Sequence, residues 1–271
     1  MIKKLAYRLV YTIIVLVLFM EFKDELERKK MNVLAIDTSN QPLSIAILKD
    51  KELIATVTTN ESKNHSVTLM PQIANLLNSV GMKPIDIDRF VVAKGPGSYT
   101  GLRIGVTTAK TFAFTLSKEL VGVSSLAVLA DAINEEGTLI VPLFDARRGN
   151  VFAGGYVKNG TELMNVIPDQ HVSLGELLEK TKSYKHIFFV GSDSHKFEEQ
   201  ILEKMSKEQR VVFSSNEDDY PQAYHLGLLG IKEKPVEIHS FVPEYLRLTQ
   251  AESQWLENHQ EKVDETFVEK I

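Results

Sequence analysis

From residue 31 onward, short apolar runs alternate with stretches of helical periodicity, a pattern typical of α/β proteins. Apolar runs bounded by turn residues predict buried strands, and the polar stretch 49–52 predicts a hairpin turn between two of them. Apolar positions that recur every three to four residues predict helices between the later strands. We expect strands at 31–37, 43–48, 53–58, 90–93 and 121–123, and helices at 66–80, 102–117 and 125–133.

The pattern begins again near Gly137, where a second apolar strand ends in an aspartate, as the first one does at Asp37. This loose parallel indicates a duplicated α/β fold whose second half is degraded. The further expected elements are strands at 138–145, 151–157 and 186–191 and a helix at 223–230. We therefore assign a first lobe to 31–135 plus about 220–252, a second lobe to 136–219 and a polar tail to 253–271.

Residues 1–30 do not fit this pattern. Basic residues precede an apolar run at 9–20, and a charged stretch follows at 21–30. The run is shorter than the ~20 residues that a spanning helix needs, and no small-residue cleavage site follows it. Three interpretations remain open: a start codon assigned too far upstream of Met31, a membrane-tethering segment, or a signal peptide.

The expected helix at 66–80 carries two apolar stripes, whereas a surface helix needs only one. One stripe consists of Val67, Met70, Ala74 and Leu77, and the other of Leu69, Ile73, Leu76 and Val80. Two stripes indicate that the helix is buried on two sides. The second side packs either within the same chain or against a partner.

The composition argues against several kinds of chemistry. The 271 residues include 31 Lys+Arg and 36 Asp+Glu, a net charge of −5, so the chain is a poor lone binder of tRNA, although a local basic patch is compatible with this balance. There is no cysteine, and none of the 7 histidines lies three or four residues from another, so the sequence offers neither a thiolate nor a helical histidine pair for a metal. It also contains no Walker A loop and no Gly-x-Ser-x-Gly elbow.

Two motifs follow the carboxyl ends of strands, where α/β sheets commonly bind ligands. The tripeptide 37–39 follows the first strand, and an aspartate there can position a metal ion or water, or simply close a side-chain-bonded turn. The loop Gly95-Pro-Gly-Ser-Tyr-Thr-Gly101 joins a strand to a helix N-terminus, where backbone N–H groups favour an anion. The alternative to anion binding is a purely structural role, in which the loop is a tight turn and Ser98 or Thr100 caps the helix. The residues alone leave these alternatives open.

These motifs, in this order, resemble the TsaB (YeaZ) family. The resemblance rests on Asp37-Thr-Ser39, on Lys94-Gly-Pro-Gly-Ser-Tyr-Thr-Gly-Leu-Arg-Ile-Gly105 and on Pro243-Glu-Tyr-Leu-Arg247, and it covers residues 31 to about 252. It implies an α/β fold of the actin/Hsp70-like (ASKHA) type, with two lobes built on duplicated β-β-β-α-β-α cores and a degenerate second lobe. It also implies a paralogue of the catalytic subunit TsaD (Gcp), whose metal-binding His-x-x-x-His motif has no counterpart here.

The resemblance further implies a non-catalytic, cytoplasmic subunit that binds and activates TsaD together with TsaE, for transfer of threonylcarbamoyl to a tRNA adenosine. We expect no catalytic residue, no metal and no intrinsic cofactor, with ATP or ADP at the interface with the partner as an option. We also expect tRNA contact only through the complex, no membrane contact for 31–271, and a homodimer as an option for the chain alone. The alternative is an ATP-binding or ATP-hydrolysing ASKHA enzyme, whereas the older glycoprotease label finds no support in the residues.

Two sets of candidate site residues follow. The nucleotide or phosphate-loop candidates are Asp37, Thr38, Ser39, Gly95, Gly97, Ser98 and Gly101. The partner-interface candidates are Leu69, Ile73, Leu76, Val80, Val106 and Phe112.

Overall fold

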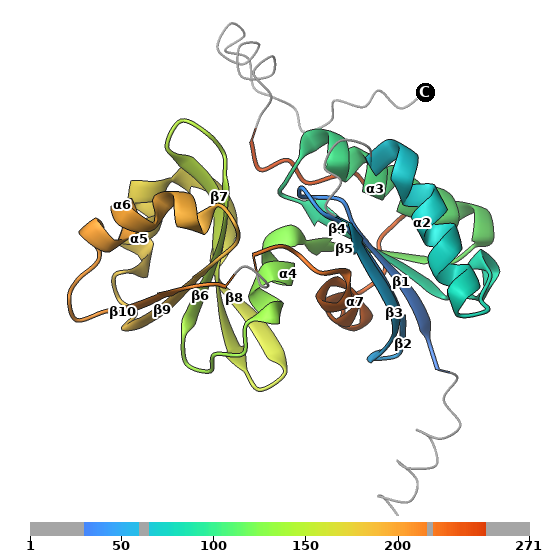
Figure 1. Ribbon diagram of the computed structural model, residues 1–271, viewed down its shortest axis with the longest axis horizontal. Helices are drawn as coiled ribbons and strands as arrows, with labels where there is room; N and C mark the ends of the chain where they lie inside the picture. The colour runs from blue at the N-terminus through green and yellow to red at the C-terminus, as the bar shows by residue number, and fades with distance from the viewer. Residues whose placement is uncertain (1–29, 60–64, 216–218, 248–271) are drawn as a thin grey trace, which may run out of the picture. The chain divides into compact units, whose positions relative to one another are not determined.

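The computed structural model describes residues 30–59, 65–215 and 219–247, and within these ranges it forms two five-stranded sheets (Figure 1). The three interpretations of the N-terminal segment and the expected polar tail concern residues that lie outside the described ranges. Within them, no helix is both long and apolar enough to cross a membrane.

The first sheet has the strand order β3-β2-β1-β4-β5. Its strands are β1 Asn32–Asp37, β2 Leu43–Lys49, β3 Glu52–Thr59, β4 Arg89–Gly95 and β5 Glu119–Ser124. β1 pairs antiparallel with β2 and parallel with β4, and β4 pairs parallel with β5. Antiparallel neighbours need only a short turn, whereas each parallel pair needs a crossover, which a helix supplies here.

Helices cover both faces of the first sheet (Figure 1). α2 (His65–Ser79) and α3 (Tyr99–Leu116) lie on one face, and α7 (Ala223–Lys232) lies on the other. Successive side chains of a strand point to opposite faces. Phe90 and Val92 therefore join the core beneath α2 and α3, whereas Val91 contacts α7 near Gly230.

The second sheet has the strand order β10-β9-β6-β7-β8. Its strands are β6 Leu139–Asp145, β7 Asn150–Asn159, β8 Glu162–Ser173, β9 His186–Val190 and β10 Arg210–Phe213. The remaining elements are α4 Ser125–Ala132, α5 Leu174–Thr181, α6 Glu198–Lys204 and the 3-10 helices Pro84–Asp86 and Ser194–Phe197. Residues of α5 and α6 share one apolar core with this sheet, and α4 packs against β6 in another.

The expected order β-β-β-α-β-α-β-α is confirmed, with boundaries that differ by a few residues. α3 begins at Tyr99 rather than near residue 102, because the Ser98 hydroxyl accepts a hydrogen bond from the Gly101 N–H and caps the helix. In the second lobe β6, β7 and β9 are confirmed, but the sequence-based prediction lacks β8, α5, α6 and β10. All but one residue of β8 are exposed or half-buried, so this strand lacks the apolar run on which the prediction depends.

The structure corrects the partner-interface candidates on α2. The candidates buried in the core of the first lobe are Leu69, Ile73 and Leu76, and the half-buried Val80 packs against the same core. The exposed apolar side chains belong to the other stripe, where Val67 is 69% and Met70 is 49% exposed. Helical periodicity reveals that two stripes exist, but it does not say which of them faces the sheet.

The two partner-interface candidates on α3 also pack in the core of the first lobe instead of facing outward. Val106 is buried in this core, and the half-buried Phe112 stacks its ring on Phe90 with the ring centroids 5.3 Å apart. The exposed side of α3 instead carries Tyr99, Arg103 and Phe114.

Candidate functional site

The carboxyl end of β1 is buried beneath the start of α3. Asp37, Thr38 and Ser39 are each 1% exposed. The Oδ1 atom of Asp37 accepts hydrogen bonds from the backbone N–H and the hydroxyl of Ser39, at 2.8 and 2.7 Å. Its Oδ2 atom has no hydrogen-bond partner among the described residues. Burial raises the pKa of Asp37 to about 6, and the hydrogen bonds from Ser39 oppose only part of this effect.

This raised pKa predicts that stability depends on pH through Asp37. The Asp37 carboxyl has a pKa of 3.8 in its reference state and of about 6 in the fold. Its contribution to the free energy of unfolding is therefore fully present below about pH 4 and is lost as the pH rises through 6. A shift of this size corresponds to about 3 kcal/mol. In Asp37→Asn the amide oxygen can still accept both bonds from Ser39, so the variant should gain about that much unfolding free energy relative to wild type between roughly pH 4 and 7. Urea denaturation of both proteins at about pH 4 and pH 7 measures this gain. If the difference in unfolding free energy between Asp37→Asn and wild type is the same at both pH values, the raised pKa is contradicted.

The glycine loop packs directly against this buried turn. The Thr38 hydroxyl donates to the Gly101 carbonyl at 2.7 Å, and the Ser98 N–H donates to the Ser39 carbonyl at 2.7 Å. A Cβ atom on Gly97 would lie 2.3 Å from the Ser39 carbonyl oxygen, and one on Gly101 would lie 2.0 Å from the Thr38 carbonyl oxygen. The two glycines therefore allow one backbone to approach another, and protein atoms fill the space beside them.

These contacts favour the structural interpretation of the loop over phosphate binding. The Ser98 N–H is bonded to Ser39, and the Gly101 N–H is bonded to the Ser98 hydroxyl at 3.3 Å, so neither donor is free for an anion. The other end of the loop meets the segment after α7, where a Cβ on Gly95 would lie 2.5 Å from the Glu244 carbonyl oxygen. The Glu244 N–H donates to the Lys94 carbonyl at 2.7 Å, which holds this segment in place.

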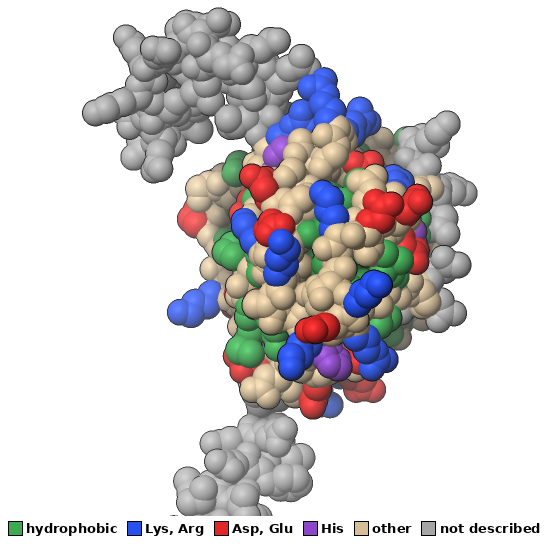
Figure 2. Space-filling view, turned by 90° about the vertical axis from the view of Figure 1, so that its left-hand side faces the viewer, with side chains coloured by type: hydrophobic (Ala, Val, Ile, Leu, Met, Phe, Trp, Pro, Cys, Tyr) green, Lys and Arg blue, Asp and Glu red, His purple; other side chains and the backbone are tan. Residues whose placement is uncertain are grey.

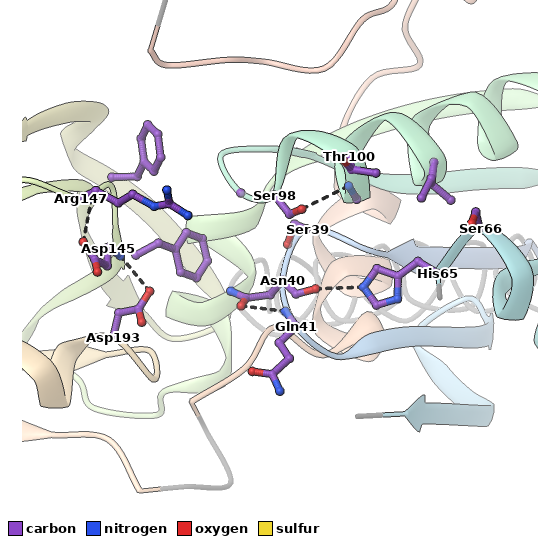
Figure 3. A pocket seen from close by; sticks show the side chains of 15 residues that line it. Ser39, Asn40, Gln41, His65, Ser66, Ser98, Thr100, Asp145, Arg147 and Asp193 are labelled. Atoms are coloured by element: carbon purple, nitrogen blue, oxygen red, sulfur yellow. Dashed lines mark hydrogen bonds between the residues drawn. The ribbon is translucent and has the colours of Figure 1, made fainter. Parts of the chain in front are cut away.

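A cleft of about 650 Å³ lies between this loop and residues of the second lobe (Figure 3). The first-lobe residues that line it are Ser39, Asn40, Gln41, His65, Ser66, Gly97, Ser98, Thr100, Gly101 and Ile104. The second-lobe residues that line it are Phe144, Asp145, Arg147, Phe152 and Asp193. The structure thus brings the candidates Ser39, Gly97, Ser98 and Gly101 to the cleft, whereas Asp37, Thr38 and Gly95 are not part of its lining.

Arg147 supplies the cleft with a guanidinium group (Figure 3). Arg147 and its neighbour Arg148 have φ angles of +66° and +55°, and this left-handed conformation costs an L-residue roughly 1–2 kcal/mol. The Arg147 N–H donates to Asp145 Oδ1 at 2.7 Å, and the Asp145 N–H donates to Asp193 Oδ2 at 2.8 Å. Asp193 also forms an ion pair with Lys196 at 2.6 Å. Two carboxylates therefore hold the turn that presents Arg147.

His65 forms part of the first-lobe side of the cleft (Figure 3). Its Nε2 lies 3.1 Å from the Asn40 carbonyl oxygen, while its buried Nδ1 has no hydrogen-bond partner among the described residues. Among the residues that the structure describes, no group of three or more His, Asp or Glu side chains is arranged to hold a metal ion. The cleft therefore combines a guanidinium, an imidazole and hydroxyl groups, which suit the binding of a small polar molecule.

The sequence patterns did not indicate Arg147 or Asp193 as site residues, and they gave His65 no role in a site. One signal was available for Arg147. The turn Arg147-Arg-Gly149 begins two residues after Asp145, which ends its strand much as Asp37 ends the first strand.

The comparisons with known proteins decide the family. The family model described as TsaD, tRNA N6-adenosine threonylcarbamoyltransferase, matches residues 52–255. A Bacillus subtilis protein named tRNA threonylcarbamoyladenosine biosynthesis protein TsaB is 44% identical over 230 residues, which cover 84% of this chain and 99% of that protein. This chain belongs to the TsaB family. The TsaB of Escherichia coli is 31% identical over 131 residues, which cover 48% of this chain and 56% of that protein.

The solved structures agree with this assignment to the TsaB family. YeaZ from Pseudomonas aeruginosa matches with a TM-score of 0.68 at 25% identity, over 80% of this chain and 100% of that chain. Together with the two five-stranded sheets and the TsaD-family match, this similarity confirms the actin/Hsp70-like (ASKHA) fold that the three sequence motifs implied.

Proposed function

We propose that this TsaB-family chain is a non-catalytic subunit in tRNA threonylcarbamoyladenosine biosynthesis, and that it binds and activates TsaD together with TsaE in the cytoplasm. The name and the 44% identity of the Bacillus subtilis relative support a role in this biosynthesis. The match to the TsaD family model over residues 52–255 supports a common fold for the chain and its proposed partner. The non-catalytic role and the partner-binding role each rest on an observation of their own.

The non-catalytic role rests on the filled glycine loop, which is the observation that carries the proposal. In an ASKHA enzyme, the strand-ending aspartate and the glycine loop would face the nucleotide phosphates and a metal ion. Here Asp37 is 1% exposed, and a Cβ on Gly101 would lie 2.0 Å from the Thr38 carbonyl oxygen. The backbone of the chain itself thus fills the side of the loop that faces Thr38, so Gly101 serves the packing of two backbone segments there.

The partner-binding role rests on what we call the α2–α3 face, defined by Val67, Met70, Ala74, Tyr99 and Arg103. All five side chains are exposed. Beside them runs a groove of about 530 Å³, lined by Ser66, Tyr99, Thr100, Arg103, Ile104, Thr107 and Thr108. The Arg103 guanidinium donates to the Tyr99 hydroxyl at 2.7 Å, and the Tyr99 ring stacks on Tyr245 with the centroids 5.0 Å apart. Methionine, tyrosine and arginine are enriched at protein interfaces, so this face suits TsaD, or a second copy of the chain when TsaD is absent.

The mixture of charges on one face of the molecule supports contact with tRNA through the complex. Over the face in Figure 2, basic and acidic side chains are interspersed and hydrophobic side chains are scattered. The net charge of −5 agrees with this distribution.

The second candidate function is that of an ATP-using ASKHA enzyme. The cleft of about 650 Å³ with Arg147 in its lining favours it, since a guanidinium is a common partner of phosphate groups. The filled glycine loop argues against it. In the first proposal the chain needs no cofactor of its own, and ATP or ADP would lie where the chain meets TsaD.

A reconstitution with the full chain separates the two candidates. TsaD, TsaE, tRNA, ATP and threonylcarbamoyl-adenylate are combined with the chain, and modified adenosine is quantified with each component omitted in turn. We expect product only when the chain and TsaD are both present, and neither product nor ATP turnover from the chain alone. Full activity of TsaD without the chain would overturn the proposal. ATP turnover by the isolated chain, if Asp37→Ala abolished it, would favour the enzyme.

A further inference from the structure

A further cavity, of about 390 Å³, has a lining rich in basic side chains. Its lining combines the turn between β2 and β3, α4, the turn between β7 and β8, and α7. The basic side chains in this lining are Lys51, Lys158, Lys232 and His225. It shares no lining residue with the cleft that contains Arg147, and we call it the lysine pocket.

Two of these lysines are held in position by the protein. The Lys232 ammonium donates to the Thr161 carbonyl at 2.7 Å. The Lys158 ammonium donates to the Asp131 carbonyl and, at 3.1 Å, to the Asn134 side chain. A lysine side chain loses conformational entropy when it is fixed, and these hydrogen bonds already impose part of that loss in the folded protein. A ligand would therefore meet ammonium groups that are already in place.

The positive charge of the lysine pocket exceeds its negative charge. Asp131 is the carboxylate in the lining; it is 8% exposed, and its Oδ2 lies 2.8 Å from His225 Nδ1. Burial lowers the pKa of Lys158, Asp131 opposes this effect, and the positive charge of Lys232 lowers the pKa further. Two ammonium groups that repel each other in one pocket are stabilised when an anion binds between them.

We propose that the lysine pocket binds a phosphate group. Each ammonium has three N–H donors, of which Lys232 uses one and Lys158 two for the bonds described above, so both have donors left for an anion. Thr161 and Tyr224 add hydroxyl groups to the lining. A phosphate group, with its negative charge and several acceptor oxygens, matches this set of cations and donors. The phosphate can come from a free phosphate compound or from the backbone of an RNA.

Pyrophosphate is the probe for the pocket, with calorimetric titration of the full chain as the measurement. We expect the double variant Lys158→Gln/Lys232→Gln to bind pyrophosphate at least tenfold more weakly than wild type, because two charge-assisted contacts are lost. The matched control is Lys207→Gln, an exposed lysine outside the pocket, and it should bind as wild type does. The proposal is overturned if the wild-type chain shows no binding at millimolar pyrophosphate, or if the double variant binds equally tightly.

A further variant keeps the test decisive if the double variant does not fold. Lys51 is exposed in a turn, so Lys51→Gln should fold as wild type and still bind pyrophosphate several-fold more weakly; equal affinity would overturn the proposal. The source of the phosphate is then found by competition. Displacement of pyrophosphate by tRNA at low salt assigns the pocket to the RNA backbone, and undiminished pyrophosphate binding assigns it to a free phosphate compound. None of these measurements uses TsaD, so their outcome is independent of the reconstitution.

Discussion

Aspartate at both Val67 and Met70 is expected to weaken binding to TsaD at least 100-fold, while the unfolding free energy stays within about 1 kcal/mol of wild type. The first effect follows from placing two charges in an interface core, where each interaction that is lost can be worth 2 kcal/mol or more. The second follows from exposure, since the two side chains are 69% and 49% exposed. Position 67 also lies in the first turn of α2, where a negative charge interacts favourably with the helix dipole.

A matched control separates this effect from a general cost of surface charge. Leu202 in α6 of the second lobe is 50% exposed, almost the same as Met70, so Leu202→Asp makes a similar change on another helix. Binding to TsaD would be measured by calorimetry, and stability by urea denaturation. If Leu202→Asp weakens binding as much as the double variant does, or if the double variant binds as wild type does, the α2–α3 face is not the site of TsaD binding.

Gly101→Ala is expected to lower the unfolding free energy by about 3 kcal/mol or more, the upper part of the range for overpacked cores. The new Cβ would lie 2.0 Å from the Thr38 carbonyl oxygen, so either the backbone that follows β1 or the start of α3 must move. Such a movement also strains the bond from the Thr38 hydroxyl to the Gly101 carbonyl, which lies between buried residues. Alanine is the better helix former by about 1 kcal/mol, but this gain is too small to offset the clash.

Gly175→Ala in α5 makes the same chemical change without the clash. Its Cβ would have only Lys204 Nζ within van der Waals contact, at 3.5 Å, and that group is the end of a flexible side chain. We expect this variant to be as stable as wild type or up to about 1 kcal/mol more stable. Urea denaturation compares the two variants. Equal stability of Gly101→Ala and Gly175→Ala would mean that the loop is open enough for a ligand, contrary to the structural interpretation.

Regular periodicity made the first lobe predictable from the sequence. The apolar runs of β1, β2 and β4 become strands whose residues are almost all buried, and such runs have few alternatives to a central strand. β8 could not be found in this way, because its residues are mostly exposed or half-buried and its pairing with β7 comes from the hairpin at 160–161. The local pattern of apolar and polar residues does not predict such pairing between strands.

The candidate site was predictable in its position but not in its chemistry. The tripeptide 37–39 and the glycine loop lie close together, as their places at strand ends indicate. Whether the glycines make room for a phosphate or for a carbonyl oxygen depends on tertiary distances that the motif does not contain. Arg147 was missed because its role depends on a left-handed turn, which sequence patterns seldom place on an arginine.

The position of α7 has a consequence for the synthesis of the protein on the ribosome. This helix covers one face of the first sheet by contacting β1 and β2, yet about 100 residues separate its start from the end of β5. At the usual ~5–20 residues per second, that face stays uncovered for about 5 to 20 s after the sheet has been made. The nascent chain therefore depends on chaperones, or on rapid docking of α4, during this interval, and a chain that terminates before residue 223 leaves the first lobe open to aggregation.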